Sequence, residues 1–88
     1  MNKYVYTLHA EQKLKLPEIK KLGINRKLIQ KVVENPLALD KSEDPVYIVI
    51  GELTDKLSLC VAYRKIGKGI RVITFYPAEK GRYESKIL

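Results

Sequence analysis

Two strand-like segments joined by a Gly-Lys-Gly turn constrain the fold of this chain more than any other feature of its sequence. Residues 57–64 alternate between larger apolar side chains and smaller or polar ones, which is the period of a strand buried on one face. Residues 70–76 form a second run rich in β-branched and aromatic residues, and Pro77 ends it. Because the glycines of the turn at 67–69 permit a tight reversal, the segment predicts an antiparallel hairpin.

A third strand is predicted just before this hairpin. Residues 46–50 carry apolar or aromatic side chains at every position, so this strand is expected to be central or covered on both faces. Residues 54–56 supply the turn into the hairpin, and the three strands form an antiparallel meander. Near the start of the chain, residues 4–8 alternate in the β pattern and predict a short first strand.

The segment between the first strand and Gly23 is predicted to be helical, with an interruption. Thr7 is a suitable N-cap, and residues 10–16 are long enough for two turns. Pro17 must interrupt or restart the helix, because proline lacks an amide hydrogen and crowds the preceding turn. Two arrangements fit: one kinked helix, or two short helices that meet at Pro17. Gly23 is expected to end the segment in the left-handed conformation that favours glycine.

The next helix is predicted over residues 26–34, after Asn25 as N-cap. Its apolar residues fall on one stripe, which predicts packing against the sheet, and the Asn-Pro pair at 35–36 stops it. Residues 37–45 are predicted to be a polar connector. The order of elements predicts a single α+β domain over residues 1–88, in which a short N-terminal strand and two helices pack with a three- to four-stranded antiparallel sheet whose opposite face is more open.

Charge limits the kind of partner. The 88 residues contain 17 Lys and Arg against 10 Asp and Glu, a formal net charge of +7. Such a field attracts polyanions such as nucleic acid, a ribosomal surface or an acidic protein; the alternative is that the lysines only solvate helix faces. No apolar run approaches the ~20 residues of a membrane-spanning helix. No secretion signal is recognisable and the single cysteine, Cys60, cannot form an internal disulfide, which predicts a cytoplasmic protein without membrane contact.

Motifs for metal, nucleotide or serine-type sites do not occur in the sequence. Its single His and single Cys are too far apart for a structural zinc site. Neither GxxxxGK[ST] nor GxGxxG is present, and no Ser-His-Asp order is recognisable. We therefore expect neither a metal nor a cofactor.

A basic and hydroxyl-bearing set of residues forms the candidate site. Arg64 and Arg71 flank the predicted hairpin turn, and arginines hold phosphate through two-point hydrogen bonds. Tyrosines stack on bases or transfer protons. Such a set would cut RNA without a metal, through attack of the 2′-hydroxyl on the adjacent phosphate. The alternatives are that the two arginines are a solvated strand-end pair, that His9 is only a helix-start residue, and that Tyr83 packs the C-terminal segment onto the sheet.

Three blocks of the sequence resemble a widespread family of small bacterial and archaeal domains of unknown function. The run TLHA at 7–10 with Lys13 resembles the family's HAxx[RK] opening, and residues 23–36 resemble its GI…V…NP block. Arg64 and the run VITFYP at 72–77 resemble its R…VITxYP ending. The family is similar to the RelE/ParE and BrnT toxins of type II toxin–antitoxin systems. Extra residues around Pro17, and Lys13 in place of the more usual arginine, depart from the pattern.

The resemblance implies a RelE-like fold, an mRNA-cleaving or translation-blocking activity on RNA or the ribosome, and an acidic antitoxin as partner, although ParE-type relatives act on gyrase. Within the matching blocks lie His9, Arg64, Thr74 and Tyr76; Arg82 and Tyr83 match only the habit of such toxins to place a basic residue and a tyrosine late in the chain. The expected catalytic residues are His9, Arg64, Tyr76, Arg82 and Tyr83. The expected nucleic-acid-binding residues are Lys13, Lys65, Lys68, Arg71 and Lys80.

Two hypotheses from other classes stand beside this one. The net charge alone fits a non-catalytic basic module that binds nucleic acid or an acidic protein segment. A structural protein without a ligand is the third possibility. The last strand is also expected to have an exposed edge, where a second copy could pair to form a homodimer.

Overall fold

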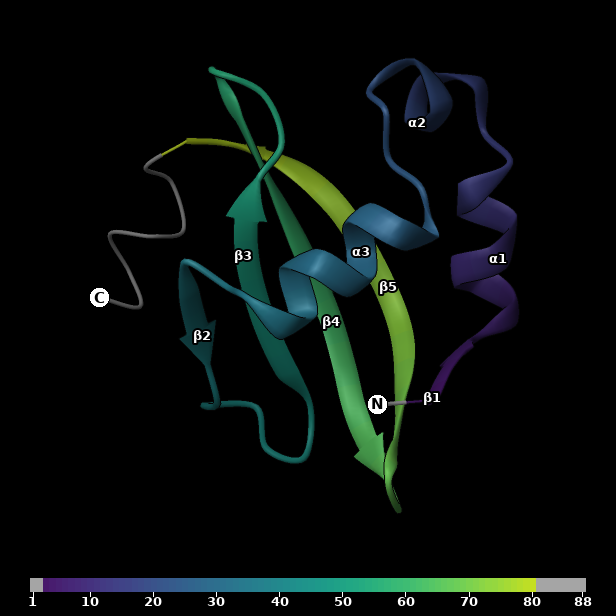
Figure 1. The fold of residues 1–88 in the computed structure, drawn as a ribbon, viewed down its shortest axis with the longest axis vertical. Coiled ribbons are helices and arrows are strands. Elements are labelled where there is room, and N and C mark those ends of the chain that lie inside the picture. Colours follow the sequence, from purple (N-terminus) through teal and green to yellow (C-terminus); the bar gives the residue numbers. More distant parts are fainter. Residues whose placement is uncertain (1–2, 81–88) are drawn as a thin grey trace.

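A computed structural model describes residues 3–80 of the chain, which fold as an α+β domain with helices packed against a mixed sheet (Figure 1). Eight elements follow in the order β1, α1, α2, α3, β2, β3, β4 and β5. Their bounds are β1 Lys3–Tyr6, α1 Leu8–Leu14, α2 Pro17–Lys21, α3 Arg26–Glu34, β2 Ala38–Asp40, β3 Tyr47–Glu52, β4 Leu57–Ile66 and β5 Gly69–Glu79.

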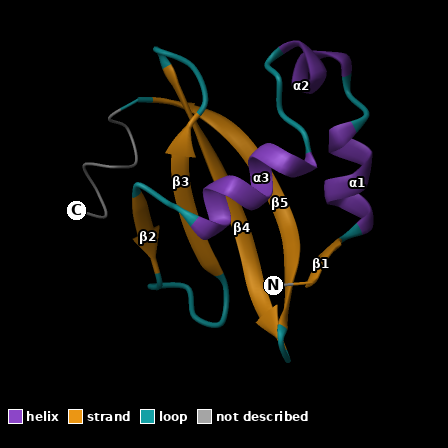
Figure 2. Cartoon of the chain, in the orientation of Figure 1, coloured by secondary structure: helices purple, strands orange, loops and turns teal. Residues whose placement is uncertain are grey.

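The sheet has five strands in the spatial order β1-β5-β4-β3-β2 (Figure 2). β1 runs parallel to β5, and the other neighbouring pairs are antiparallel. The prediction of an antiparallel sheet with three or four strands is therefore wrong in strand number and in the direction of one pair. The last strand is not an edge strand either, because β5 lies between β1 and β4.

The unpredicted strand, β2, lies within the segment expected to be a polar connector. Ala38 is buried opposite Ile50, and the Leu37 N–H donates to the Ile50 carbonyl at 2.8 Å. A strand of three residues shows too little alternation to stand out from a polar stretch. β2 is therefore recognised as a strand only by its pairing with β3 in the structure.

The first strand and first helix meet two residues earlier than expected. β1 ends at Tyr6, and α1 already begins at Leu8, which is 71% exposed. Thr7 is the predicted N-cap: its side chain accepts a hydrogen bond from the Ala10 N–H at 3.2 Å. The cap fixes the start of the helix, and Leu8 consequently belongs to the helix rather than to the strand.

Pro17 separates two short helices, which decides between the two arrangements that the sequence left open. α1 ends at Leu14, and Pro17 occupies the first position of α2, where its missing amide hydrogen is no loss. Gly23 has the predicted positive φ, 78°. The bounds of α3 and its cap by Asn25, which accepts from the Leu28 N–H at 2.9 Å, are confirmed. Between residues 3 and 80, no helix is long and apolar enough to cross a membrane.

The main core lies between α3 and the sheet. Ile29 and Val32 of α3 pack in one buried cluster with Val61 of β4 and Phe75 of β5. The helix approaches β3 closely at Gly51, where a Cβ atom would lie 2.5 Å from a methyl group of Val32. Glycine at this position is what allows α3 to cross the sheet in contact with it (Figure 1).

The opposite face of the sheet is also buried in its middle, which contradicts the expectation of a half-buried β4 and an open face. Ser58, Cys60 and Ala62 of β4 and Ile50 of β3 are at most 8% exposed, yet they lie outside the cluster under α3. β4 is the central strand, and its side chains on this face are small. Cys60, the single cysteine of the chain, is buried on this face.

Candidate nucleic-acid interface

Two arginines face each other across the β4–β5 hairpin. Arg64 and Arg71 are directly opposite in the ladder and both side chains are exposed. Residues directly opposite in an antiparallel pair have Cβ atoms about 5 Å apart on the same face of the sheet. The two guanidinium groups can therefore contact one phosphate or two adjacent phosphates from the same side.

The end of this hairpin carries positive charge without any acidic residue. Between 64 and 71 the chain has four cations, Arg64, Lys65, Lys68 and Arg71, and no Asp or Glu. The ion pairs within residues 3–80 are Arg26–Glu11 and Lys80–Glu52, and neither involves the hairpin. Like charges directly opposite each other destabilise a sheet, so an anionic ligand would relieve the repulsion between Arg64 and Arg71.

A β-bulge in β5 determines which residues share the face of the arginine pair. Tyr63 is opposite Val72 and Ala62 is opposite Thr74, so Ile73 is an extra residue without a partner on β4. Strict alternation would put Thr74 on the face opposite Arg71; because of the bulge, Thr74 and then Tyr76 lie on the same face as Arg71. Tyr76, opposite Cys60, is four β4 residues from the arginine pair, or about 13 Å along the strand.

Lys13, a predicted nucleic-acid-binding residue, is engaged with β5. Its ammonium group donates to the Phe75 carbonyl and lies 3.5 Å from the Thr74 hydroxyl. It also lies 5.1 Å from the centroid of the Phe75 ring and 5.9 Å from that of Tyr76. Partial burial lowers the pKa of Lys13 from its ordinary value. Lys13 is thus a contact between α1 and the edge of β5, close to Thr74 and Tyr76.

Lys65 lies on the other face of the hairpin from the arginines. Its ammonium group is 5.5 Å from the centroid of the Tyr47 ring, and Tyr47 packs edge-to-face on Tyr63 with centroids 5.6 Å apart. Burial, with a smaller contribution from Tyr47, raises the pKa of Tyr63. Lys68 is exposed in the turn. The hairpin therefore presents cations on both of its faces and at its tip.

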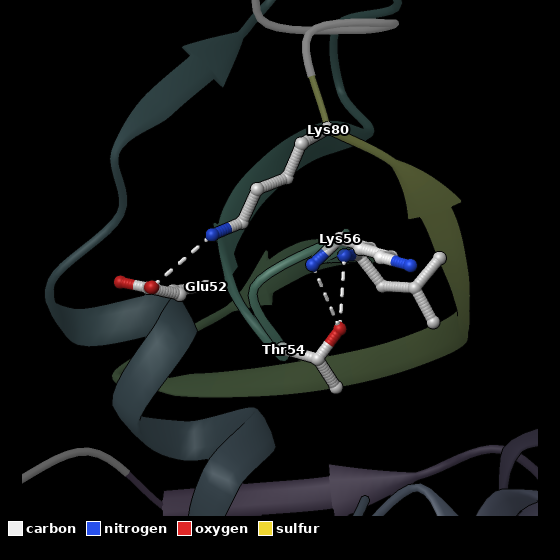
Figure 3. A network of polar contacts seen from close by, with 5 residues as sticks. Glu52, Thr54, Lys56 and Lys80 are labelled. Atoms are coloured by element: carbon white, nitrogen blue, oxygen red, sulfur yellow. Dashed lines mark hydrogen bonds and ion pairs between the residues drawn. The ribbon is translucent and has the colours of Figure 1, made fainter.

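Lys80 is far from the arginine pair. It follows the end of β5, nine residues beyond Arg71, which corresponds to about 30 Å of strand. Its ammonium group pairs with the Glu52 carboxylate at 3.2 Å (Figure 3). The backbone N–H of Lys80 donates to the Lys56 carbonyl at 3.1 Å. A cavity of about 730 Å³ lies at this end, lined in part by Leu22, Leu57 and Lys80.

The remaining predicted residues fall in two places. His9 is exposed in the first turn of α1. Arg82 and Tyr83 lie outside the described residues. The structure therefore brings Arg64, Arg71, Thr74 and Tyr76 onto one face, adds Lys13 at the edge of that face, and separates Lys80 from them.

Sequence reasoning missed the bulge and the contacts of α1 that accompany it. Val72 and Phe75 are three residues apart and both are buried in the cluster under α3, which strict alternation does not permit. That spacing was the available signal for a bulge. Within the described range, no group of three or more His, Cys, Asp or Glu side chains could hold a metal ion.

Comparison of the chain with protein-family models, with curated proteins and with solved structures gives no match. The resemblance to the small toxin-related family consequently remains a prediction.

Proposed function

We propose that this chain is a toxin-like protein that acts on RNA as a metal-independent endoribonuclease or a translation inhibitor. The observation that carries the proposal is the exposed cross-strand pair of Arg64 and Arg71, within residues 64–71, which contain four cations and no acid. An RNA phosphate accepts hydrogen bonds from two guanidinium groups and removes their mutual repulsion. A protein partner would need a matching pair of carboxylates at the same spacing.

The proposed cleavage needs only a few chemical groups of the protein. The RNA 2′-oxygen attacks the adjacent phosphorus, the bond to the 5′-oxygen breaks, and a 2′,3′-cyclic phosphate results. One group takes the proton of the 2′-hydroxyl and another gives a proton to the leaving 5′-oxygen. Arg64 and Arg71 stabilise the charge on the phosphate. Tyr76 and His9 are the described candidates for the proton transfers.

Support for a RelE/ParE-like fold comes from the order of elements and from the matching blocks. A strand, helices and then antiparallel strands follow one another, and Lys13 of the first block contacts β5 within the last block. The net charge of +7 suits an acidic antitoxin as partner. If the chain forms a homodimer by strand pairing, the available sheet edges are those of β1 and β2.

The test is an RNA cleavage assay with purified protein, with and without ribosomes. We expect cleavage by the wild type, a large loss in Arg64→Ala and Arg71→Ala, and little change in Lys27→Ala. Lys27 is an exposed cation on α3, outside the hairpin, and matches the charge removed. Cleavage products with cyclic phosphate ends identify the mechanism. No cleavage and no inhibition of translation by the wild type would reject the proposal.

A non-catalytic basic module is the second candidate. The observation that favours it is the position of the cations: the hairpin cations are exposed and unpaired with acids in the described residues, whereas Lys13 and Lys80 already have protein partners. Affinity for RNA in the absence of cleavage, with a steep negative salt dependence, would support this candidate over the ribonuclease.

A further inference from the structure

The edge of β5 beyond β1 is closed by Thr7, the N-cap of α1, and by Lys13 of α1. The β1–β5 ladder ends at Tyr6 opposite Val72. The Thr7 N–H then donates to the Val72 carbonyl at 3.0 Å, the Thr7 hydroxyl donates to the Ile73 carbonyl at 2.7 Å, and the Lys13 ammonium donates to the Phe75 carbonyl. Donors from Thr7 and Lys13 thus replace the strand that has ended, at the three carbonyl groups around the bulge.

Thr7 has two roles at this point. Its hydroxyl accepts the hydrogen bond from the Ala10 N–H that caps α1, and it donates to the carbonyl of the bulged residue, Ile73. A hydroxyl has one donor and two acceptor positions, so both bonds coexist. The two roles can be separated by substitution, because capping needs only an acceptor and the bond to Ile73 needs a donor.

The packing of the core requires a bulge in β5 but does not determine which residue is the extra one. Val72 and Phe75 both pack under α3, so one extra residue must be accommodated between them. The hydrogen bond from Thr7 favours Ile73 as that residue, since it satisfies the carbonyl that the interrupted ladder leaves without a donor.

We propose that Thr7 is a positioning residue for the candidate interface: its hydroxyl holds the bulge at Ile73 and so keeps Thr74 on the face that carries Arg64, Arg71 and Tyr76. The consequence for RNA binding rests on the proposed function. The position and rigidity of the bulge are independent of the proposed function, and they are measured separately.

Three substitutions test the bulge. Thr7→Ser keeps acceptor and donor, Thr7→Asp keeps the acceptor for the cap but has no hydrogen to donate at neutral pH, and Thr7→Val has neither. We expect amide hydrogen exchange at Thr74 and Phe75 to become about tenfold faster in Thr7→Asp and Thr7→Val, and to be unchanged in Thr7→Ser. The cross-strand NMR contact between Ala62 and Thr74 should weaken in the same two variants.

The matched control is Asn25→Ala, which removes the side-chain acceptor that caps α3 at the Leu28 N–H. It reports the effect of losing a helix cap alone. Wild-type exchange in Thr7→Asp, or equally fast exchange in Asn25→Ala, would overturn the proposal at the level of the bulge.

RNA affinity tests the consequence for the interface, and the comparison uses Thr7→Val against Thr7→Ser because neither changes the net charge. We expect about tenfold weaker binding in Thr7→Val, the loss of one good contact, and wild-type binding in Thr7→Ser. Equal binding by both, with a mobile bulge in Thr7→Val, would show that Thr7 does not position the interface. No binding by the wild type would reject the proposed function, while the exchange data would still decide whether Thr7 holds the bulge.

Discussion

The two ends of the β4–β5 pair carry cations in opposite electrostatic settings. At the hairpin end, Arg64, Lys65, Lys68 and Arg71 occur without an acid in the same segment. At the other end, Lys56 and Lys80 lie among Glu52, Asp55 and Glu79 around one cavity and its neighbouring ion pair. A count of lysines and arginines treats both ends alike. The two ends thus differ in ion pairing: among the described residues Lys80 pairs with Glu52, whereas no ion pair involves the hairpin cations.

The strongest test of this comparison removes two cations from one end at a time. We expect Arg64→Ala/Arg71→Ala to weaken binding of single-stranded RNA about 100-fold, because two charge-assisted contacts at ~1.4 kcal/mol each are lost. Lys56→Ala/Lys80→Ala removes the same net charge and should change the affinity less than about threefold. Fluorescence anisotropy at constant salt measures both. Equal losses would mean that RNA senses only the net charge of +7.

Salt dependence separates phosphate contacts from other interactions at the hairpin end. Each phosphate contact to single-stranded nucleic acid contributes about −0.7 to the slope of log affinity against log salt. The double arginine variant should therefore have a slope less negative by about 1.4. The Lys56→Ala/Lys80→Ala variant should keep the wild-type slope. An unchanged slope in the arginine variant would show that Arg64 and Arg71 do not contact phosphate.

Removing one cation should change the free energy of unfolding in opposite directions at the two ends. Replacing Arg71 by Thr removes a like-charge pair opposite Arg64 and adds a good strand former, so the free energy of unfolding should rise by about 0.5 kcal/mol. Lys80→Ala breaks an exposed ion pair with Glu52 and should lower it by about 0.5 kcal/mol or less. Urea unfolding at low salt measures both changes. A loss of stability in Arg71→Thr would contradict the argument that the hairpin stores repulsion.

Much of the fold follows from the sequence, and the predictions that were wrong have identifiable physical causes. The hairpin, α3 with its cap at Asn25, and the cap at Thr7 depend on local patterns that the sequence displays directly. The parallel pairing of β1 with β5 depends on contacts between the two ends of the chain, which no local period encodes. β2 is too short for its alternation to be recognised.

The candidate site was predictable in its residues more than in its arrangement. The arginine pair follows from two positions flanking one turn, and the structure places Arg64 opposite Arg71. The alignment of Thr74 and Tyr76 with them depends on the bulge at Ile73, and period-two reasoning assigns those two residues to the other face. The position of Lys80 after the last strand predicts a place in the site, but β5 extends to Glu79 and places Lys80 at the opposite end of the sheet.

Lys13 provides the last and smallest test, since it is a cation between the two ends that is neither exposed like the arginines nor paired with an acid in the described residues. Burial lowers the pKa of Lys13 in the folded state from its ordinary value of 10.5. The unfolded chain then binds more protons than the folded one between the two pKa values, so the free energy of unfolding contributed by Lys13 rises as the pH increases through that window. Above 10.5 the contribution is complete, and it is lost as the pH falls through the folded-state value.

Lys13→Met keeps the apolar stem of the side chain and removes the titrating group, so it should abolish this rise. Lys27→Met on the exposed face of α3 is the matched control and should leave the pH dependence as in the wild type. Urea unfolding of the three proteins from neutral pH to the ordinary lysine value compares them directly. The same rise in Lys13→Met as in the wild type would show that Lys13 is solvated like the hairpin cations, and its contact with the Phe75 carbonyl would then not bury the charge.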